Sequence, residues 1–202
     1  RFRNLGGETN TDKFKRGYGY QGGASRTSLS ELVAEVKYGP ELKEAILKPG
    51  EWYVGLTAFG ETLPDHNNKM SLDYEKLDEW GLPTVTFDAD FGENELAMRK
   101  DMQEQAVRML TAAGYEDVRG YDNTQGRAMG LGIHEMGTAR MGRDPKTSVL
   151  NKHNQIHSCT NVYVTDGAFM TSAACHNPSL GYMAFTARAA NHAAEQLKKT
   201  KA

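Results

Sequence analysis

The sequence predicts an α+β fold in which an antiparallel sheet packs against helices. Three short segments, residues 52–61, 69–72 and 84–89, combine alternating apolar residues with flanking turn residues, a pattern that is typical of strands. Two longer segments, residues 93–113 and 178–198, repeat apolar residues at helical spacing. With 202 residues and a hydrophobic fraction of 39%, the chain is large enough to bury a core.

The N-terminal part is rich in glycine and contains several aromatic residues. Residues 1–27 are therefore predicted to form a loop-rich surface segment with one short strand. Residues 28–48 are predicted to be helical, because Ser28 and Glu31 have the spacing of a capping box. A Gly-Pro pair that begins at Gly39 divides this segment into two short helices.

The predicted strands are expected to form a meander, because turn residues separate them. Asn67 and Asn68 mark one turn, and residues 78–83 form a tight loop. A sheet over about residues 52–89 would have one apolar face that must be covered, and the helix 93–113 is expected to cover it. The apolar residues of that helix are Leu96, Met98, Met102, Ala106, Val107, Met109 and Leu110.

The C-terminal part differs in composition. Five glycines in residues 126–142 predict a loop that lies close to a ligand or to packed backbone. A short strand is expected at 161–165, followed by the helix 178–198. The side of this helix that is predicted to pack inward carries Leu180, Met183, Ala184, Ala187, Ala190 and Ala194. We therefore divide the chain into residues 1–125 and residues 126–202.

Composition argues against several classes of partner. The formal net charge is -2 without a basic cluster, so no nucleic acid is expected, and no apolar run approaches the ~20 residues of a membrane helix. Cys159 and Cys175 suit either two thiols or one disulfide and do not fix the compartment, so the localisation is left unassigned. The chain opens with Arg1 in what resembles the middle of a longer domain, so we expect it to be a piece of a longer protein.

The spacing of the histidines and cysteines does not match a zinc site. His153 and His157 are four residues apart, and Cys175 directly precedes His176. Neither pair belongs to an HExxH helix or to a Cys-x-x-Cys pattern, which are the spacings that hold zinc. No metal site is predicted.

Two polar residues carry the chemistry of the C-terminal part. His134 lies in the glycine-rich loop, where a neutral imidazole can accept a proton from a hydroxyl group. Asn177 precedes Pro178, a residue favoured in the first turn of a helix, and taken alone it would be read as the cap of that helix. The same helix end offers unpaired N–H groups and a positive dipole, which favour a bound negative charge.

The segments around these residues are GIHEMGTARMG (132–142), VYVTDGAFM (162–170) and HNPSLGYMAF (176–185). Together they resemble the C-terminal part of the glucose-methanol-choline (GMC) oxidoreductase family. The resemblance implies oxidation of a CH–OH group by hydride transfer to FAD, with His134 as the base and Asn177 as the partner of the substrate hydroxyl. It leaves open whether His176 or Asn177 faces the substrate. The residues it implies beside the cofactor are Asp166, Gly167, Ala168, Asn177, Pro178 and Ser179.

The resemblance also implies where FAD is held. A dinucleotide requires a GxGxxG turn between a strand and a helix, and GYGYQGG at 17–23 lacks both neighbours. FAD would therefore be bound mainly by an N-terminal FAD-binding portion of the same protein, and this chain alone would hold no FAD and be inactive. Residues 1–125 would form a substrate-binding-type domain, and residues 126–202 would supply the catalytic loop and a strand and helix that complete the FAD domain.

The implied substrate is a small-molecule alcohol or sugar, because the sequence is more similar to sugar and polyol dehydrogenases than to cholesterol or choline oxidases. Nothing in the sequence separates an oxidase from a dehydrogenase or names the electron acceptor, and the oligomeric state is equally open. The alternative function is a non-catalytic carbohydrate-binding or subunit-docking domain that retains the fold. Its sugar platform would be Trp52, Tyr53, Phe59 and Trp80, for which core packing is the commoner role.

Overall fold

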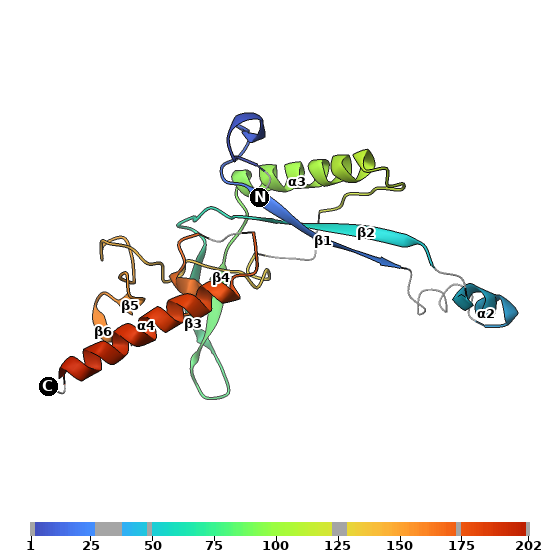
Figure 1. Cartoon of the computed structure of the whole chain (residues 1–202). Helices are drawn as coiled ribbons and strands as arrows, with labels where there is room; N and C mark the ends of the chain where they lie inside the picture. Colours follow the sequence, from blue (N-terminus) through green and yellow to red (C-terminus); the bar gives the residue numbers. More distant parts are fainter. Residues whose placement is uncertain (1–2, 27–37, 48–49, 123–128, 173–174, 201–202) are drawn as a thin grey trace.

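The computed structural model describes residues 3–26, 38–47, 50–122, 129–172 and 175–200 (Figure 1). Its helices and 3₁₀ turns are η1 (Gly7–Thr9), α2 (Pro40–Leu47), α3 (Glu93–Ala112), η3 (Gly167–Phe169) and α4 (Ser179–Thr200). Its strands are β1 (Tyr18–Arg26), β2 (Trp52–Gly60), β3 (Lys69–Leu77), β4 (Pro83–Asp88), β5 (Gln155–Ile156) and β6 (Cys159–Tyr163). The α+β class is confirmed. The first helix predicted between residues 28 and 48, with Ser28 and Glu31, lies outside the described residues.

Within the described residues the strands pair as three separate two-stranded antiparallel sheets, β1 with β2, β3 with β4 and β5 with β6. The predicted single meander over residues 52–89 is therefore wrong, because β2 pairs with β1 and not with β3. The register of β1 and β2 runs from Tyr18 opposite Gly60 to Arg26 opposite Trp52. Glycine is depleted in strands, so the glycine-rich sequence of β1 gave a weak strand signal although it forms nine residues of regular ladder.

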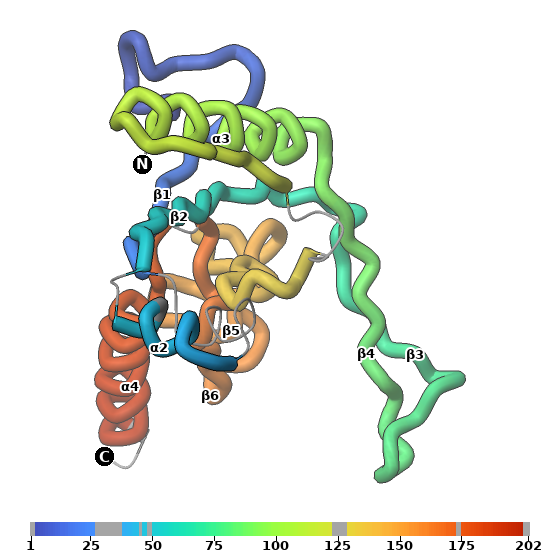
Figure 2. The backbone as a smooth tube through the Cα atoms, turned by 90° about the vertical axis from the view of Figure 1, so that its right-hand side faces the viewer, coloured from blue at the N-terminus to red at the C-terminus, as the bar shows by residue number. Residues whose placement is uncertain are grey.

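Helix α3 lies across one face of the β1–β2 ribbon (Figures 1 and 2). The Tyr18 hydroxyl donates to Asp101 of α3 at 2.5 Å, and the Tyr20 hydroxyl donates to the carbonyl of Met102 at 2.6 Å. Gly60 permits this close approach, since a Cβ atom there would lie 2.6 Å from the sulfur of Met98 and closer still to Met102. Helix α3 therefore covers both β1 and β2. The β3–β4 hairpin extends away from this helix (Figure 2).

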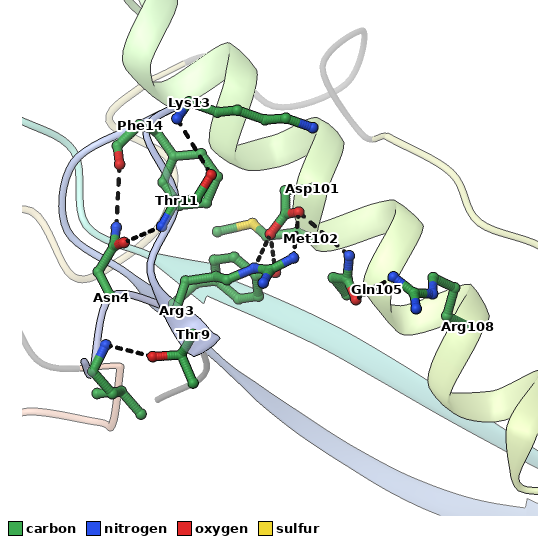
Figure 3. Close-up of polar contacts among 12 residues, drawn as sticks. Arg3, Asn4, Thr9, Thr11, Lys13, Phe14, Asp101, Met102, Gln105 and Arg108 are labelled. Carbon is green, nitrogen blue, oxygen red and sulfur yellow. Dashed lines mark hydrogen bonds and ion pairs between the residues drawn. The ribbon is translucent and has the colours of Figure 1, made fainter. Parts of the chain in front are cut away.

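The inward face of α3 is only partly apolar. Met98 is buried as predicted, but Leu96 is 50% exposed, while the acidic residues Glu95 and Asp101 are buried. Arg3 donates two hydrogen bonds to the Asp101 carboxylate at 2.8 and 2.9 Å (Figure 3). Burial alone would raise the pKa of Asp101, but the hydrogen bonds from Arg3 and Tyr18 outweigh it and hold the pKa below its usual value.

The inward face of α4 also differs from the prediction. Leu180 and Met183 are 78% and 68% exposed, so the predicted stripe faces outward. The packed side carries Tyr182, Phe185 and Ala189, and the ring centroids of Phe185 and Phe169 are 4.8 Å apart. Aromatic rings bury much more area than alanine methyl groups, so they set the rotation of the helix about its axis.

The remaining elements shift only at their ends. The strand expected at 161–165 is β6, which lies two residues earlier and pairs with β5. The strand expected at 69–72 continues to Leu77. Among the described residues, no helix combines the length and the apolar character needed to cross a membrane.

Candidate active site

The β1–β2 ribbon has a second face, opposite the one that α3 covers. Gly19 pairs with Phe59 and Gln21 pairs with Thr57, so Gln21 and Phe59 project from the same side of the ribbon. The ring of Phe59 contacts the imidazole of His134, with centroids 6.0 Å apart. The side-chain amide of Gln21 donates to the carbonyl of Cys175 at 3.1 Å. This face therefore holds both the His134 loop and the segment that leads to Asn177.

The loop that presents His134 is shaped by two left-handed backbone positions. Ile133 has a φ of 57° and is 87% exposed, and Gly137 has a φ of 88°. The Glu135 carboxylate accepts a hydrogen bond from the amide of Gly132 at 2.7 Å, which closes the turn. The turn directs Ile133 into solvent and leaves His134 half-buried against Phe59.

The chain after His134 runs alongside the Asp-Gly-Ala turn. The amide of Ala139 donates to the carbonyl of Ala168, and the amide of Met141 donates to the carbonyl of Phe169, each at 3.0 Å. A longer bond of 3.4 Å joins the Gly137 amide to the Gly167 carbonyl. These bonds hold the His134 loop and η3 together over three successive positions.

Asp166 orders the start of η3. Its carboxylate accepts a hydrogen bond from the amide of Ala168 at 2.9 Å, which makes it the cap of the 3₁₀ turn. The amide of Ala168 is thus already engaged by Asp166, while its carbonyl is engaged by Ala139. Asp166 therefore orders the turn that contains Gly167 and Ala168.

Gly167 is the point of closest packing between three segments. A Cβ atom at this buried position would lie 2.6 Å from the hydroxyl of Tyr182 and 3.0 Å from the carbonyl of Glu135. Any side chain would therefore push the His134 loop away from α4. Burial, followed by the negative charges of Asp166 and Glu135, raises the pKa of Tyr182, so its hydroxyl stays protonated in this setting.

Helix α4 begins one residue later than predicted. The amide of Tyr182 donates to the carbonyl of Pro178 at 3.1 Å, so Pro178 occupies the cap position and Asn177 lies just outside the helix. The prediction that Asn177 itself caps the helix is therefore wrong. His176, Asn177 and Ser179 are exposed, and the His176 ring nitrogen lies 3.7 Å from the sulfur of Cys175.

The structure thus joins most of the residues that the sequence singled out. The chain that follows His134 is hydrogen bonded to the turn with Gly167 and Ala168, and Tyr182 of α4 packs on Phe169 of that turn. Two positions before Asn177, the Cys175 carbonyl is fixed to the ribbon by the hydrogen bond from Gln21. The relative position of the His134 and Asn177 side chains stays a prediction.

Several contributing residues were missed by sequence reasoning. Phe59, Gln21 and Tyr182 support the His134 loop and the start of α4 from elements distant in sequence. The close approach of Gly167 had a signal, because glycine after an Asp at a strand end often marks backbone packing. The pairing of β1 with β2 had no comparable signal in the sequence.

The described residues show neither a disulfide nor a metal-binding cluster. Cys159 and Cys175 are both free thiols. Within the ranges that the structure describes, no three His, Cys, Asp or Glu side chains are grouped in a way that could hold a metal ion.

Comparison with known proteins gives matches over this same region. A family model described as GMC oxidoreductase matches residues 64–186. The 2-methyl-1,2-propanediol dehydrogenase of Mycolicibacterium austroafricanum is 34% identical over 137 residues, which are 66% of this chain and 24% of that protein. The 6'''-hydroxyparomomycin C oxidase of Streptomyces lividus is 33% identical over 139 residues, 69% of this chain and 25% of that protein.

A third relative matches a larger share of the chain. The fructose dehydrogenase large subunit of Gluconobacter japonicus is 28% identical over 183 residues, 91% of this chain and 32% of that protein. The chain thus spans about a quarter to a third of the length of these curated relatives. Because the family match covers more than half of its residues and the motif residues lie within it, the chain belongs to the GMC oxidoreductase family and corresponds to a C-terminal portion.

Proposed function

We propose that this chain supplies the catalytic side chains of an FAD-dependent oxidoreductase that converts a CH–OH group of an alcohol or sugar into a carbonyl group. The observation that carries the proposal is the attachment of the His134 loop. One side of that loop rests on Phe59 of β2, and the other side is hydrogen bonded to the turn that contains Gly167 and Ala168. A half-buried imidazole that rests on an aromatic ring, in a loop that is itself hydrogen bonded to a second turn, is suited to repeated proton transfer in one geometry.

In the proposed reaction, His134 accepts the proton of the substrate hydroxyl. Asn177 donates its side-chain amide to the same hydroxyl oxygen and orients it without competing for the proton. FAD, when bound, supplies the acceptor for the hydride that leaves the carbon atom. Phe59 limits the rotation of His134, and Gly167 keeps the loop at its distance from α4.

The residues near the start of α4 are compatible with an anionic cofactor. Because the first helical bond is made by the Tyr182 amide, the amides of Ser179, Leu180 and Gly181 have no acceptor within the helix. Such donors, together with the helix dipole, favour negative charge nearby. Gly167 and Ala168 belong to η3, which packs against the first turn of α4 at Tyr182. Most of the contacts to FAD would come from an N-terminal portion of a full-length protein, which this chain does not include.

The substrate class follows from the relatives. Their names include a diol dehydrogenase and a fructose dehydrogenase, so a polyol or a sugar is the proposed substrate. The relatives named above are all dehydrogenases and oxidases, so the comparisons do not favour the non-catalytic carbohydrate-binding alternative.

The test uses a fusion protein that joins the N-terminal portion of the 2-methyl-1,2-propanediol dehydrogenase, which this chain does not match, to the 202-residue chain. We expect the purified fusion protein to carry FAD and to be reduced by at least one alcohol or sugar when these are mixed anaerobically. Bleaching of the flavin absorbance near ~450 nm is the measurement, and a bimolecular rate above ~10⁴ per molar per second would be ordinary for an enzyme. A fusion protein that holds FAD but is reduced by no alcohol or sugar of a broad panel contradicts the proposal.

A further inference from the structure

The β3–β4 hairpin is amphipathic, with its apolar side uncovered. Met70 pairs with Phe87 and Leu72 pairs with Val85, so these four side chains share one face. Lys69, Ser71, Asp73, Thr84, Thr86 and Asp88 share the other face. The four apolar side chains, which we call the hairpin face, are 57%, 73%, 50% and 48% exposed in the order of the pairs. The polar residues Asp73 and Thr84 are less exposed, the reverse of what water alone would favour.

A two-stranded hairpin of this kind needs a partner. Isolated two-stranded sheets are marginal in water, and exposed apolar patches usually mark an interaction site. The described residues leave the apolar side of this hairpin open to solvent, so a covering surface is missing there.

The occupant can be argued from the comparisons. The hairpin lies inside residues 64–186, so it belongs to the part of the chain that the family shares. This chain matches a quarter to a third of the length of its relatives, and the remainder of each relative is available in the same molecule. The hairpin face carries no charged side chain, so its partner must offer an apolar surface and not a nucleic acid or an acidic ligand.

We propose that the hairpin face, formed by Met70, Leu72, Val85 and Phe87, is the docking surface for the N-terminal portion of a full-length GMC polypeptide. The two outer strand edges of the hairpin offer further backbone donors and acceptors to the same partner. This inference rests on the proposed function, because it assumes that the chain works beside an FAD-binding portion. It adds the surface through which the two parts join, at a distance from the His134 loop.

The test compares two matched substitutions in two proteins. Phe87→Asp places a charge on the hairpin face, and Thr86→Asp places the same charge on the opposite face of the same strand. In the isolated 202-residue chain Phe87 is 73% exposed, so both variants should melt within ~1 °C of wild type. In the fusion protein, Phe87→Asp should lower the melting temperature by ~4 °C or more, whereas Thr86→Asp should leave it unchanged.

Each other outcome contradicts the docking surface. Equal melting of Phe87→Asp and wild type in the fusion protein would mean that nothing covers the hairpin face there. A large loss for Phe87→Asp in the isolated chain would mean that the face is covered within the chain or by a second copy, which light scattering would reveal as a dimer. Flavin reduction is measured in the same preparations. An active fusion protein that tolerates Phe87→Asp rejects the docking surface alone, and an inactive one that Phe87→Asp destabilises rejects the proposed function alone.

Discussion

The imidazole of His134 lies against the ring of Phe59, with centroids 6.0 Å apart and ring planes inclined at 33°. The two residues come from segments 75 positions apart, and the contact fixes a loop residue to a nine-residue strand. A catalytic base on a glycine-rich loop would otherwise sample many orientations. The strand therefore supplies rigidity that the loop sequence lacks.

The first prediction concerns Phe59. Phe59→Leu keeps an apolar side chain but removes the flat ring, so we expect flavin reduction in the fusion protein to slow by about 10- to 100-fold while FAD stays bound. Tyr53→Leu removes an aromatic ring from an exposed position of the same strand and should leave the rate within twofold. Equal rates in the two variants would show that the ring contact does not position His134.

The second prediction concerns Gly167. Gly167→Ala places a methyl group 2.6 Å from the hydroxyl of Tyr182, so the free energy of unfolding should fall by ~1–3 kcal/mol. Adding Tyr182→Phe removes that hydroxyl and should restore part of the loss, whereas the contact with the Glu135 carbonyl remains. Gly23→Ala is the control, because its Cβ would meet nothing within 4 Å. Urea denaturation measures all four proteins, and a neutral Gly167→Ala would contradict the close packing.

The third prediction concerns the acid stability that Asp101 confers. Its pKa in the folded chain is lowered from 3.8, so the carboxylate stabilises the fold above about pH 4 and this contribution is lost as the pH falls through the folded pKa. Asp101→Asn should therefore show a smaller loss of stability between pH 5 and pH 2.5 than wild type. Tyr18→Phe removes one of the donors and should give an intermediate result. Parallel acid titration curves for all three proteins would contradict the account.

The fourth prediction concerns the stacked rings of His153 and His192, whose centroids are 3.9 Å apart. Burial, together with the positive charges of His192, Lys152 and Arg188, lowers the pKa of His153 from 6.5, and Glu195 opposes this only in part. The unfolded chain then binds a proton more readily, so stability should fall as the pH drops below about 6.5.

The matched test of this pair compares His153→Asn with His66→Asn. His66 is exposed, so the His66→Asn variant should keep the pH dependence of wild type. His153→Asn should weaken that dependence over the range from pH 6.5 to pH 5, as measured by chemical denaturation. An unchanged slope in His153→Asn would mean that the stacked pair does not resist protonation.

The sequence predicted the local features of this fold well. The helix 93–113 and the loop with His134 were found from periodicity and from glycine, which are properties of short segments. The partner of β2 could not be found this way, because β1 is rich in glycine and its pairing joins residues that lie 26 to 42 positions apart in the sequence. The buried Asp101 was missed for a similar reason, since an acid is buried only when a distant donor such as Arg3 reaches it.

The site was predicted to a comparable degree. His134 and Gly167 were named from motif spacing, and the structure joins their loops by hydrogen bonds. The side of α4 that was predicted to face inward was wrong. The prediction followed the spacing of the alanines, whereas the rings of Tyr182 and Phe185 are the side chains that pack on Phe169. Contacts from other elements decide such rotations, and a single helix sequence contains little of that information.

The most direct test of the central claim, that His134 is the catalytic base, is the rate of anaerobic flavin reduction in the fusion protein carrying His134→Ala. Loss of a general base should lower this rate by ~100- to 10,000-fold, while FAD content and melting temperature stay those of wild type. Asn177→Ala, which removes an orienting hydrogen bond, should have a milder effect. If His134→Ala reduces its flavin as fast as wild type with the same substrate, His134 does not accept the hydroxyl proton.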